Sequence, residues 1–143
     1  MVDRISKSRR SENMRRIRSR DTQPELAVRK ALTALKVRYR IHYRQLPGTP
    51  DIAIPRLKLA INVHGCFWHR HPGCPDATMP KTNTEFWETK FSRNVERDAR
   101  KREQLEALGW RELVIWECET EHPEELREQL SATINAYSQE MNA

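Results

Sequence analysis

The chain has 143 residues, of which 37% are hydrophobic and 32% are charged, and it contains three cysteines. This length is enough to bury one hydrophobic core and excludes two. No apolar run approaches the roughly 18 residues of a membrane span, and the charged N-terminus lacks the apolar stretch of a secretory signal. We therefore expect a single-domain cytoplasmic protein whose thiols are reduced, metal-bound or buried rather than paired in disulfides.

The net charge of +6 is distributed unevenly along the sequence. Residues 1–20 carry eight basic and two acidic side chains, whereas residues 112–143 carry eight glutamates and one arginine. Concentrated positive charge gains affinity for phosphates by counterion release, so the asymmetry favours a polyanion as partner. A solvated arm without a partner is the alternative for this segment. We expect residues 1–20 to form an arm and residues 21–143 to form one domain.

The first predicted element is a helix. Thr22, Pro24 and Glu25 have the spacing of a capping box with proline in the first turn, so the helix should begin there and end near residue 36. The side chains expected on its core side are Leu26, Ala31, Leu32 and Leu35.

Three strands are predicted next. Apolar and polar side chains alternate over residues 37–44, which is typical of a half-buried strand with a basic outer face. The apolar runs 51–54 and 58–63 then predict a hairpin, and the Pro-rich segment 66–82 has no periodicity and predicts a loop.

The second half of the chain predicts helix, strand and helix. A charge-rich segment over 84–108 stops at a glycine and favours a long helix. Residues 110–116 are a candidate buried strand, and residues 123–139 are typical of an amphipathic helix. The complete order predicts an α/β fold in which helices flank a mixed sheet.

Asp51 is the first candidate for chemistry. It stands at the start of one predicted strand, and the next strand ends at Val63 and His64. Because neighbouring strands lie about 5 Å apart, these residues can meet at one cation. Mg²⁺ prefers oxygen ligands and acts on phosphates bound opposite, so a basic chain with this pattern favours phosphodiester chemistry. A lone aspartate at this position can also simply cap the turn.

The three cysteines form a second candidate site. Cys66, His71 and Cys74 lie in the predicted loop, and Cys118 follows the last strand. Three thiolates and one imidazole are the ligand composition of a structural zinc site, and a long irregular loop needs such an anchor. Three unrelated cysteines, two of them in the core, are the alternative.

His64 and His69 remain outside the candidate zinc set. Imidazoles titrate near neutral pH and suit proton transfer, although a single histidine is more often a surface or core residue. A histidine base commonly needs a carboxylate to orient it, and Asp98 on the long predicted helix is available for that role.

The segments LPGTPDIAI, VHGCFWHRH, EFWETKFSRNVERD and LGWRELVIWEC resemble the very short patch repair mismatch endonucleases, and the likeness runs from residue 11 to about Cys118. The resemblance implies a restriction-endonuclease-like fold with structural zinc. It implies a Mg²⁺-dependent nick 5′ of the thymine in a T·G mismatch left by deamination of 5-methylcytosine. It also implies a bacterial, nucleoid-associated monomer that binds double-stranded DNA and works beside other mismatch-repair proteins.

The resemblance also assigns roles to individual residues. Asp51 and the backbone carbonyl of Val63 would hold Mg²⁺, His69 would be the general base oriented by Asp98, and His64 would assist at the phosphate. Glu25 matches an active-site carboxylate, although the capping box already explains it. The zinc ligands would be Cys66, His71, Cys74 and Cys118. The acid-x-Lys triplet of the wider nuclease superfamily is replaced here by residues 61–63, Ile-Asn-Val, which agrees with a histidine base.

Recognition of a mispair requires opening of the base stack, which proteins achieve with apolar wedges. Phe67 and Trp68 are adjacent in a polar loop, so both cannot easily point inward. By resemblance, the aromatic residues wedge beside the mismatch, Lys90 and Asn94 contact the mispaired bases, and the basic arm clamps the opposite groove. The implied DNA-binding residues are Met14, Arg15, Arg16, Arg18, Phe67, Trp68, Trp87, Lys90 and Asn94.

A second hypothesis comes from a different functional class. The chain could be a non-catalytic, zinc-stabilised module that binds distorted duplex DNA. Asp51, His64 and His69 discriminate between the two hypotheses, because a protein that only binds DNA does not require them.

Overall fold

A computed structural model describes residues 21–141. In this range the helices and strands are α2 (Gln23–Ala34), β1 (Arg40–Ile41), β2 (Ile52–Ile54), β3 (Leu59–His64), α3 (Thr84–Ala107), β4 (Arg111–Trp116) and α4 (Pro123–Met141), with 3₁₀ turns at Pro55–Leu57 and Glu117–Glu121. The predicted arm, including Met14, Arg15, Arg16 and Arg18, lies outside the described residues. Among those residues, no helix combines the length and apolar character needed to cross a membrane.

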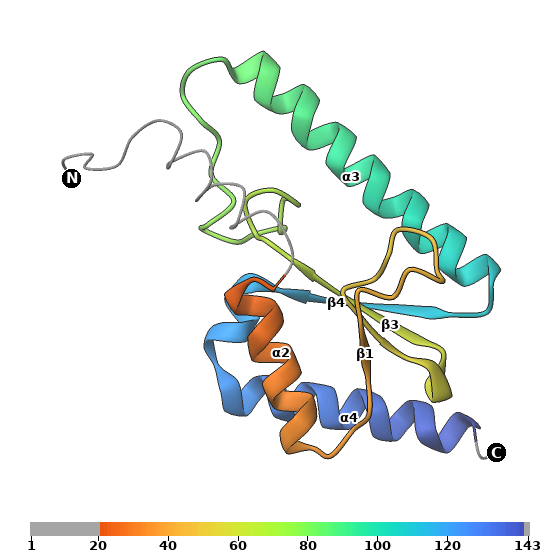
Figure 1. The fold of residues 1–143 in the computed structure, drawn as a ribbon. Helices are drawn as coiled ribbons and strands as arrows, with labels where there is room; N and C mark the ends of the chain where they lie inside the picture. The colour runs from red at the N-terminus through yellow and green to blue at the C-terminus, as the bar shows by residue number, and fades with distance from the viewer. Residues whose placement is uncertain (1–20, 142–143) are drawn as a thin grey trace.

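The strands form one mixed sheet in the order β1-β2-β3-β4. The first three strands are antiparallel neighbours, and β3 and β4 run parallel because α3 connects them. In Figure 1, α2 and α4 lie together on one side of the sheet and α3 crosses the other side. The predicted α/β class and the order of its elements are therefore confirmed.

The alternation of side chains along β3 separates a core from a polar face. Leu59 and Ile61 are fully buried in the main core, which β2, β3 and β4 share with α2 and α4. Ala60 points the other way and packs with Leu105 of α3 in a smaller cluster. Because successive side chains of a strand alternate faces, Asn62 and His64 lie on the α3 side of the sheet.

Helix α2 begins as predicted. The Thr22 hydroxyl accepts from the Glu25 amide, and the Glu25 carboxylate accepts from the Thr22 amide at 2.8 Å, which completes the capping box. The expected core face was wrong at Leu26, which is 40% exposed, while Val28 is buried. Val28, Ala31, Leu32 and Leu35 follow the i, i+3, i+4, i+7 spacing of one helix face, and Leu26 lies about 200° around the axis from Val28.

The predicted strand over residues 37–44 was largely wrong. Only Arg40 and Ile41 pair with β2, and Ile41 is 44% exposed. The backbone of His42 has a left-handed φ of 45°, which ends the strand. The apolar residues of this segment instead divide between two clusters, because Tyr39 packs on the main core and Tyr43 packs on the smaller cluster beneath α3.

The remaining elements were predicted correctly apart from their boundaries and the burial of β4. The hairpin, the loop over 66–82, the long helix and the final helix are all present. Of the six residues of β4, only Ile115 is buried, because β4 is an edge strand rather than a central one.

Candidate functional site

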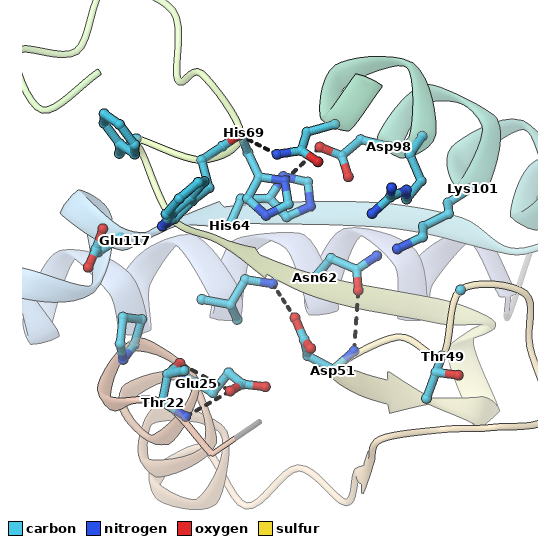
Figure 2. A pocket seen from close by; sticks show the side chains of 18 of the residues that line it. Thr22, Glu25, Thr49, Asp51, Asn62, His64, His69, Asp98, Lys101 and Glu117 are labelled. Carbon is cyan, nitrogen blue, oxygen red and sulfur yellow. Dashed lines mark hydrogen bonds and ion pairs between the residues drawn. The ribbon is translucent and has the colours of Figure 1, made fainter. Parts of the chain in front are cut away.

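A cleft of about 910 Å³ opens between α2, the sheet and α3. Figure 2 shows Glu25 and Asp51 on one side of this cleft and His69 and Asp98 on the other. The first pair comes from α2 and the start of β2, and the second from the loop after β3 and from α3. Segments that are distant in sequence therefore bring acidic and imidazole groups to one space.

Asp51 is held by the neighbouring strand of its hairpin. Its Oδ2 accepts from the Val63 amide at 2.8 Å, and its own amide donates to Asn62 Oδ1 at 3.2 Å. Asn62 in turn donates to Glu112 Oε2 at 2.7 Å. The pKa of Asp51 is raised to about 7, mainly by burial; the Val63 hydrogen bond opposes this increase, and the negative charge of Glu25 contributes to it.

Glu25 uses its two carboxylate oxygens differently. The side chain is 3% exposed, and Oε2 accepts from the Thr22 amide and hydroxyl in the capping box. Oε1 is also buried but has no hydrogen-bond partner among the described residues. Such an oxygen is costly to bury, and a cation shared with Asp51 would remove that cost. A cap and a metal ligand are therefore compatible roles for Glu25, and the oxygen donors at this place fit Mg²⁺.

His69 and Asp98 are in direct contact. His69 Nδ1 lies 2.6 Å from Asp98 Oδ2, the arrangement that leaves Nε2 of the same ring free to accept a proton. Burial alone would raise the pKa of Asp98, but the hydrogen bond with His69 and the electrostatic effects of His69, His64 and Lys101 lower it. Asp98 is therefore ionised at neutral pH and can stabilise a protonated His69.

His64 stacks on His69 with 4.0 Å between the ring centroids and 9° between the ring planes. The pKa of His64 is lowered to about 4, mainly by burial and in addition by the nearby His69 and Lys101, against the opposing effect of Asp98. The His64 ring is therefore neutral at pH 7, and it limits rotation of the His69 ring by covering one of its faces.

The cysteine-rich loop forms a compact cluster next to the cleft. The ligand atoms of four residues lie within 4.8 Å of one another, and these residues are Cys66, His71, Cys74 and Cys118. His71 Nδ1 lies 3.6 Å from Cys66 Sγ and 3.5 Å from Cys118 Sγ, and its ring stacks on Trp116. Burial raises the pKa of the Cys66 thiol to about 12, so a cation is needed to keep a thiolate there. The arrangement could hold zinc.

Phe67 and Trp68 are neither fully buried nor fully exposed, which agrees with the expectation that both cannot point inward. Both are half-buried against aromatic side chains of α3, with Phe67 5.2 Å from Phe91 and Trp68 5.8 Å from Trp87 between ring centroids. An aromatic cluster on a neighbouring helix can cover part of two adjacent side chains, which the loop sequence alone did not indicate. Phe67 and Trp68 also line the cleft.

Lys90 and Asn94 line the same cleft one turn apart on α3. Asn94 Nδ2 donates to the Trp68 carbonyl at 3.2 Å, so this side chain also ties the loop to the helix. Lys90 Nζ lies 5.7 Å from the centroid of the Trp68 ring.

The polar residues of the cleft lining that sequence reasoning missed include Asn62 and Lys101. Asn62 could have been found from strand alternation, since it shares a face with His64. Lys101 could have been found from helical spacing, since it follows Asp98 by three positions. The side chain of Lys101 packs on Gly48, where a Cβ would lie only 2.7 Å from the lysine Cδ.

A carboxylate pair and a histidine bound to a carboxylate therefore face one cleft, an arrangement that suits metal-assisted hydrolysis. The sequence matches the profile of the family described as DNA mismatch endonuclease Vsr over residues 2–75. It is 47% identical over 119 residues to the type II nicking enzyme V.XorIIP of Xanthomonas oryzae, covering 83% of this chain and 87% of that one.

Two further relatives extend the match. The DNA mismatch endonuclease Vsr of Escherichia coli is 42% identical over 129 residues, 90% of this chain and 82% of the relative. The type II nicking enzyme V.NmeAIP of Neisseria meningitidis is 39% identical over 134 residues, 94% of this chain and 95% of the relative. The chain therefore belongs to the Vsr family of DNA mismatch endonucleases.

Proposed function

We propose that the protein nicks duplex DNA 5′ of the thymine in a T·G mismatch, by Mg²⁺-dependent hydrolysis of one phosphodiester bond. Such mismatches arise where 5-methylcytosine deaminates, and the nick would begin very short patch repair. The observation that carries the proposal is the cleft with Glu25 and Asp51 on one side and the bonded pair His69 and Asp98 on the other.

The metal would be held by the oxygens on the α2 side of the cleft. The buried unpaired oxygen of Glu25, the Asp51 carboxylate and the Val63 carbonyl suit a hard cation. Bound there, Mg²⁺ would polarise the scissile phosphate and stabilise the charge that develops on it.

The imidazole side of the cleft would move the proton. His69 would accept a proton from the attacking water at Nε2, while Asp98 fixes Nδ1–H and stabilises the imidazolium. His64, neutral and stacked on His69, would hold that ring in place and donate a hydrogen bond to a phosphate oxygen. The water oxygen would bond to phosphorus as the P–O bond to the adjoining sugar oxygen breaks, and that oxygen would take a proton from solvent and leave as a hydroxyl.

Recognition would use the face formed by the loop and α3. Phe67, Trp68 and Trp87 would wedge beside the mismatch, and Lys90 and Asn94 would contact the mispaired bases. The basic arm with Met14, Arg15, Arg16 and Arg18 would clamp the opposite groove. We also propose that the enzyme acts as a monomer, with a restriction-endonuclease-like core and with zinc bound by Cys66, His71, Cys74 and Cys118.

A nicking assay tests this function. Labelled duplexes with T·G or T·A at one position are incubated with the protein in Mg²⁺ or in EDTA. We expect a nick in the thymine strand of the T·G duplex alone, with Mg²⁺ alone, and its loss in the Asp51→Ala and His69→Ala variants with binding retained. A gel shift on T·G duplex without any nick would instead favour the non-catalytic DNA-binding module.

A further inference from the structure

His42 lies beside both candidate metal-binding residues of the α2 side of the cleft. Its backbone amide donates to the Asp51 carbonyl at 3.0 Å, which ties it to the first residue of the metal site. Its ring Nε2 lies 3.8 Å from Oε1 of Glu25, the buried oxygen without a hydrogen bond. One residue therefore contacts both the backbone of Asp51 and the side chain of Glu25.

The backbone of His42 is unusual for a residue that carries a side chain. Its φ of 45° lies in the left-handed region, which costs a residue with a Cβ about 1 kcal/mol or more. Two backbone hydrogen bonds, from His42 to Asp51 and from Tyr43 to Pro50, hold the chain in this conformation. Six other described residues that carry a side chain also have a positive φ, so what distinguishes His42 is what its ring contacts.

The imidazole confines the Glu25 carboxylate without occupying its free lone pairs. Thr22 binds Oε2, and the separation of 3.8 Å between His42 Nε2 and Oε1 is too long for a hydrogen bond. Oε1 therefore stays available to a cation while the ring limits rotation of the carboxylate.

The ring is itself held from the side of α2. Arg29 Nη2 lies 3.4 Å from His42 Nε2 and donates to Asp21 Oδ1 at 2.6 Å. The side chains of Arg29 and His42 are both largely buried. Because its ion pair with Asp21 fixes the Arg29 guanidinium, Arg29 limits movement of the His42 ring away from Glu25.

From these contacts we infer that His42 is a positioning residue, which sets the Glu25 carboxylate relative to Asp51 for binding of a divalent cation. The inference rests on the proposed metal-dependent function. Removal of the ring would let Glu25 turn or take up water, so the cation would bind less tightly while the zinc cluster and the main core keep their structure.

Direct binding of Mn²⁺, used as a paramagnetic probe for the Mg²⁺ site, tests the inference. Electron paramagnetic resonance of the full-length protein would measure free Mn²⁺ in the wild type and in the variants Asp51→Asn, His42→Ala, His42→Gly and His42→Gln. We expect His42→Ala to weaken Mn²⁺ binding about tenfold, or about 1.4 kcal/mol. The Mg²⁺ concentration for half-maximal nicking should rise by a similar factor, with the rate at saturating Mg²⁺ little changed.

The other two substitutions of His42 separate the ring from the backbone. Glycine relieves the left-handed strain but removes the ring, so it should weaken Mn²⁺ binding as alanine does and provides the test should the alanine variant fail to fold. Glutamine keeps a polar side chain that reaches Glu25 and should restore most of the affinity. Wild-type affinity in the glycine variant, or in a folded alanine variant, overturns the positioning role.

The Asp51→Asn variant separates failure of the inference from failure of the proposed function. If wild type and Asp51→Asn bind Mn²⁺ equally, the metal site itself is refuted, and the inference about His42 falls with it. If only the wild type binds and the ring-deleted variants match it, the metal site stands and the role of His42 is refuted.

Discussion

Asp51 shows how a residue placed for metal binding can lower the stability of the folded protein. Its carboxylate is buried beside a second carboxylate, and its pKa is raised from 3.8 to about 7. The protonated form is favoured in the folded state, so folding without metal should lose stability as the pH rises from about 4 to about 7 and stay at the lower value above that range. A divalent cation would reverse this penalty.

The substitution Asp51→Asn should therefore stabilise the metal-free protein. In EDTA at pH 8 we expect a gain of roughly 2–4 kcal/mol in the free energy of unfolding, falling to zero below about pH 4. Urea denaturation at several pH values measures it. Asp76→Asn, which removes an exposed carboxylate of the loop, is the matched control and should have little effect. Equal effects of the two substitutions at pH 8 would contradict the assignment.

Substitution within the His69 and Asp98 pair should lower the rate of nicking without lowering the affinity for DNA. Asp98→Asn preserves the shape of the contact but not the charge that stabilises an imidazolium, so nicking should fall by about 10²–10⁴-fold with DNA affinity retained. Single-turnover nicking and a gel shift measure the two effects. Glu96→Gln removes an exposed acid from the same helix and should leave the rate within about twofold. A small rate loss in Asp98→Asn would remove it from the mechanism.

At the scale of elements, the loop after β3 shows what a sequence pattern can and cannot predict. The absence of periodicity correctly predicted a loop, and the residue types suggested a metal cluster. The contacts that position the loop were not predictable, because Arg70 holds an irregular fold of the loop itself and the other contacts join the loop to α3. Arg70 donates to the carbonyls of Ala77 and Thr78 and covers the Phe91 ring at 4.1 Å, and Asn94 binds the Trp68 carbonyl.

The segment around β1, unlike the loop, was predicted with the wrong secondary structure. Its alternating pattern was correct that Tyr39 and Tyr43 are partly covered, wrong about Ile41, which is exposed, and wrong about the strand, because the two tyrosines pack into different clusters. Periodicity indicates which side chains are candidates for burial and does not indicate which element covers them. The left-handed backbone of His42, which brings its ring to Glu25, has no signature in the residue type.

The zinc proposal belongs to this scale because it concerns the whole loop. His71→Asn should reduce bound zinc from about one equivalent to nearly none, since a three-ligand site binds more weakly. Because Phe67 and Trp68 lie on the same loop, discrimination between T·G and T·A should fall as well. His122→Asn changes an exposed histidine outside the cluster and should keep both properties. Metal analysis and paired nicking rates measure the outcome, and full zinc content in His71→Asn would refute the ligand set.

At the scale of the whole molecule, the two sides of the cleft are held by hydrophobic clusters of different size. The α2 side is continuous with the main core, whereas α3 is held by the small cluster at Leu105 and by the aromatic cluster around Phe91. The carboxylates of the metal site belong to the first part, and Asp98 belongs to α3. The distance across the cleft therefore depends on how firmly α3 packs on the sheet.

A matched pair of core substitutions tests this dependence. Leu105 and Leu130 are both fully buried, the first between α3 and the sheet and the second in the main core on α4. Leu105→Ala and Leu130→Ala should each cost about 2–5 kcal/mol of stability. Rates are compared at a temperature below the melting temperature of both variants. Leu105→Ala should lower the nicking rate at saturating Mg²⁺ about tenfold or more, because a small misplacement of Asp98 and His69 lowers the rate strongly. Leu130→Ala should keep a rate near that of the wild type. Equal rates in two folded variants of equal stability would show that the packing of α3 does not set the geometry of the site.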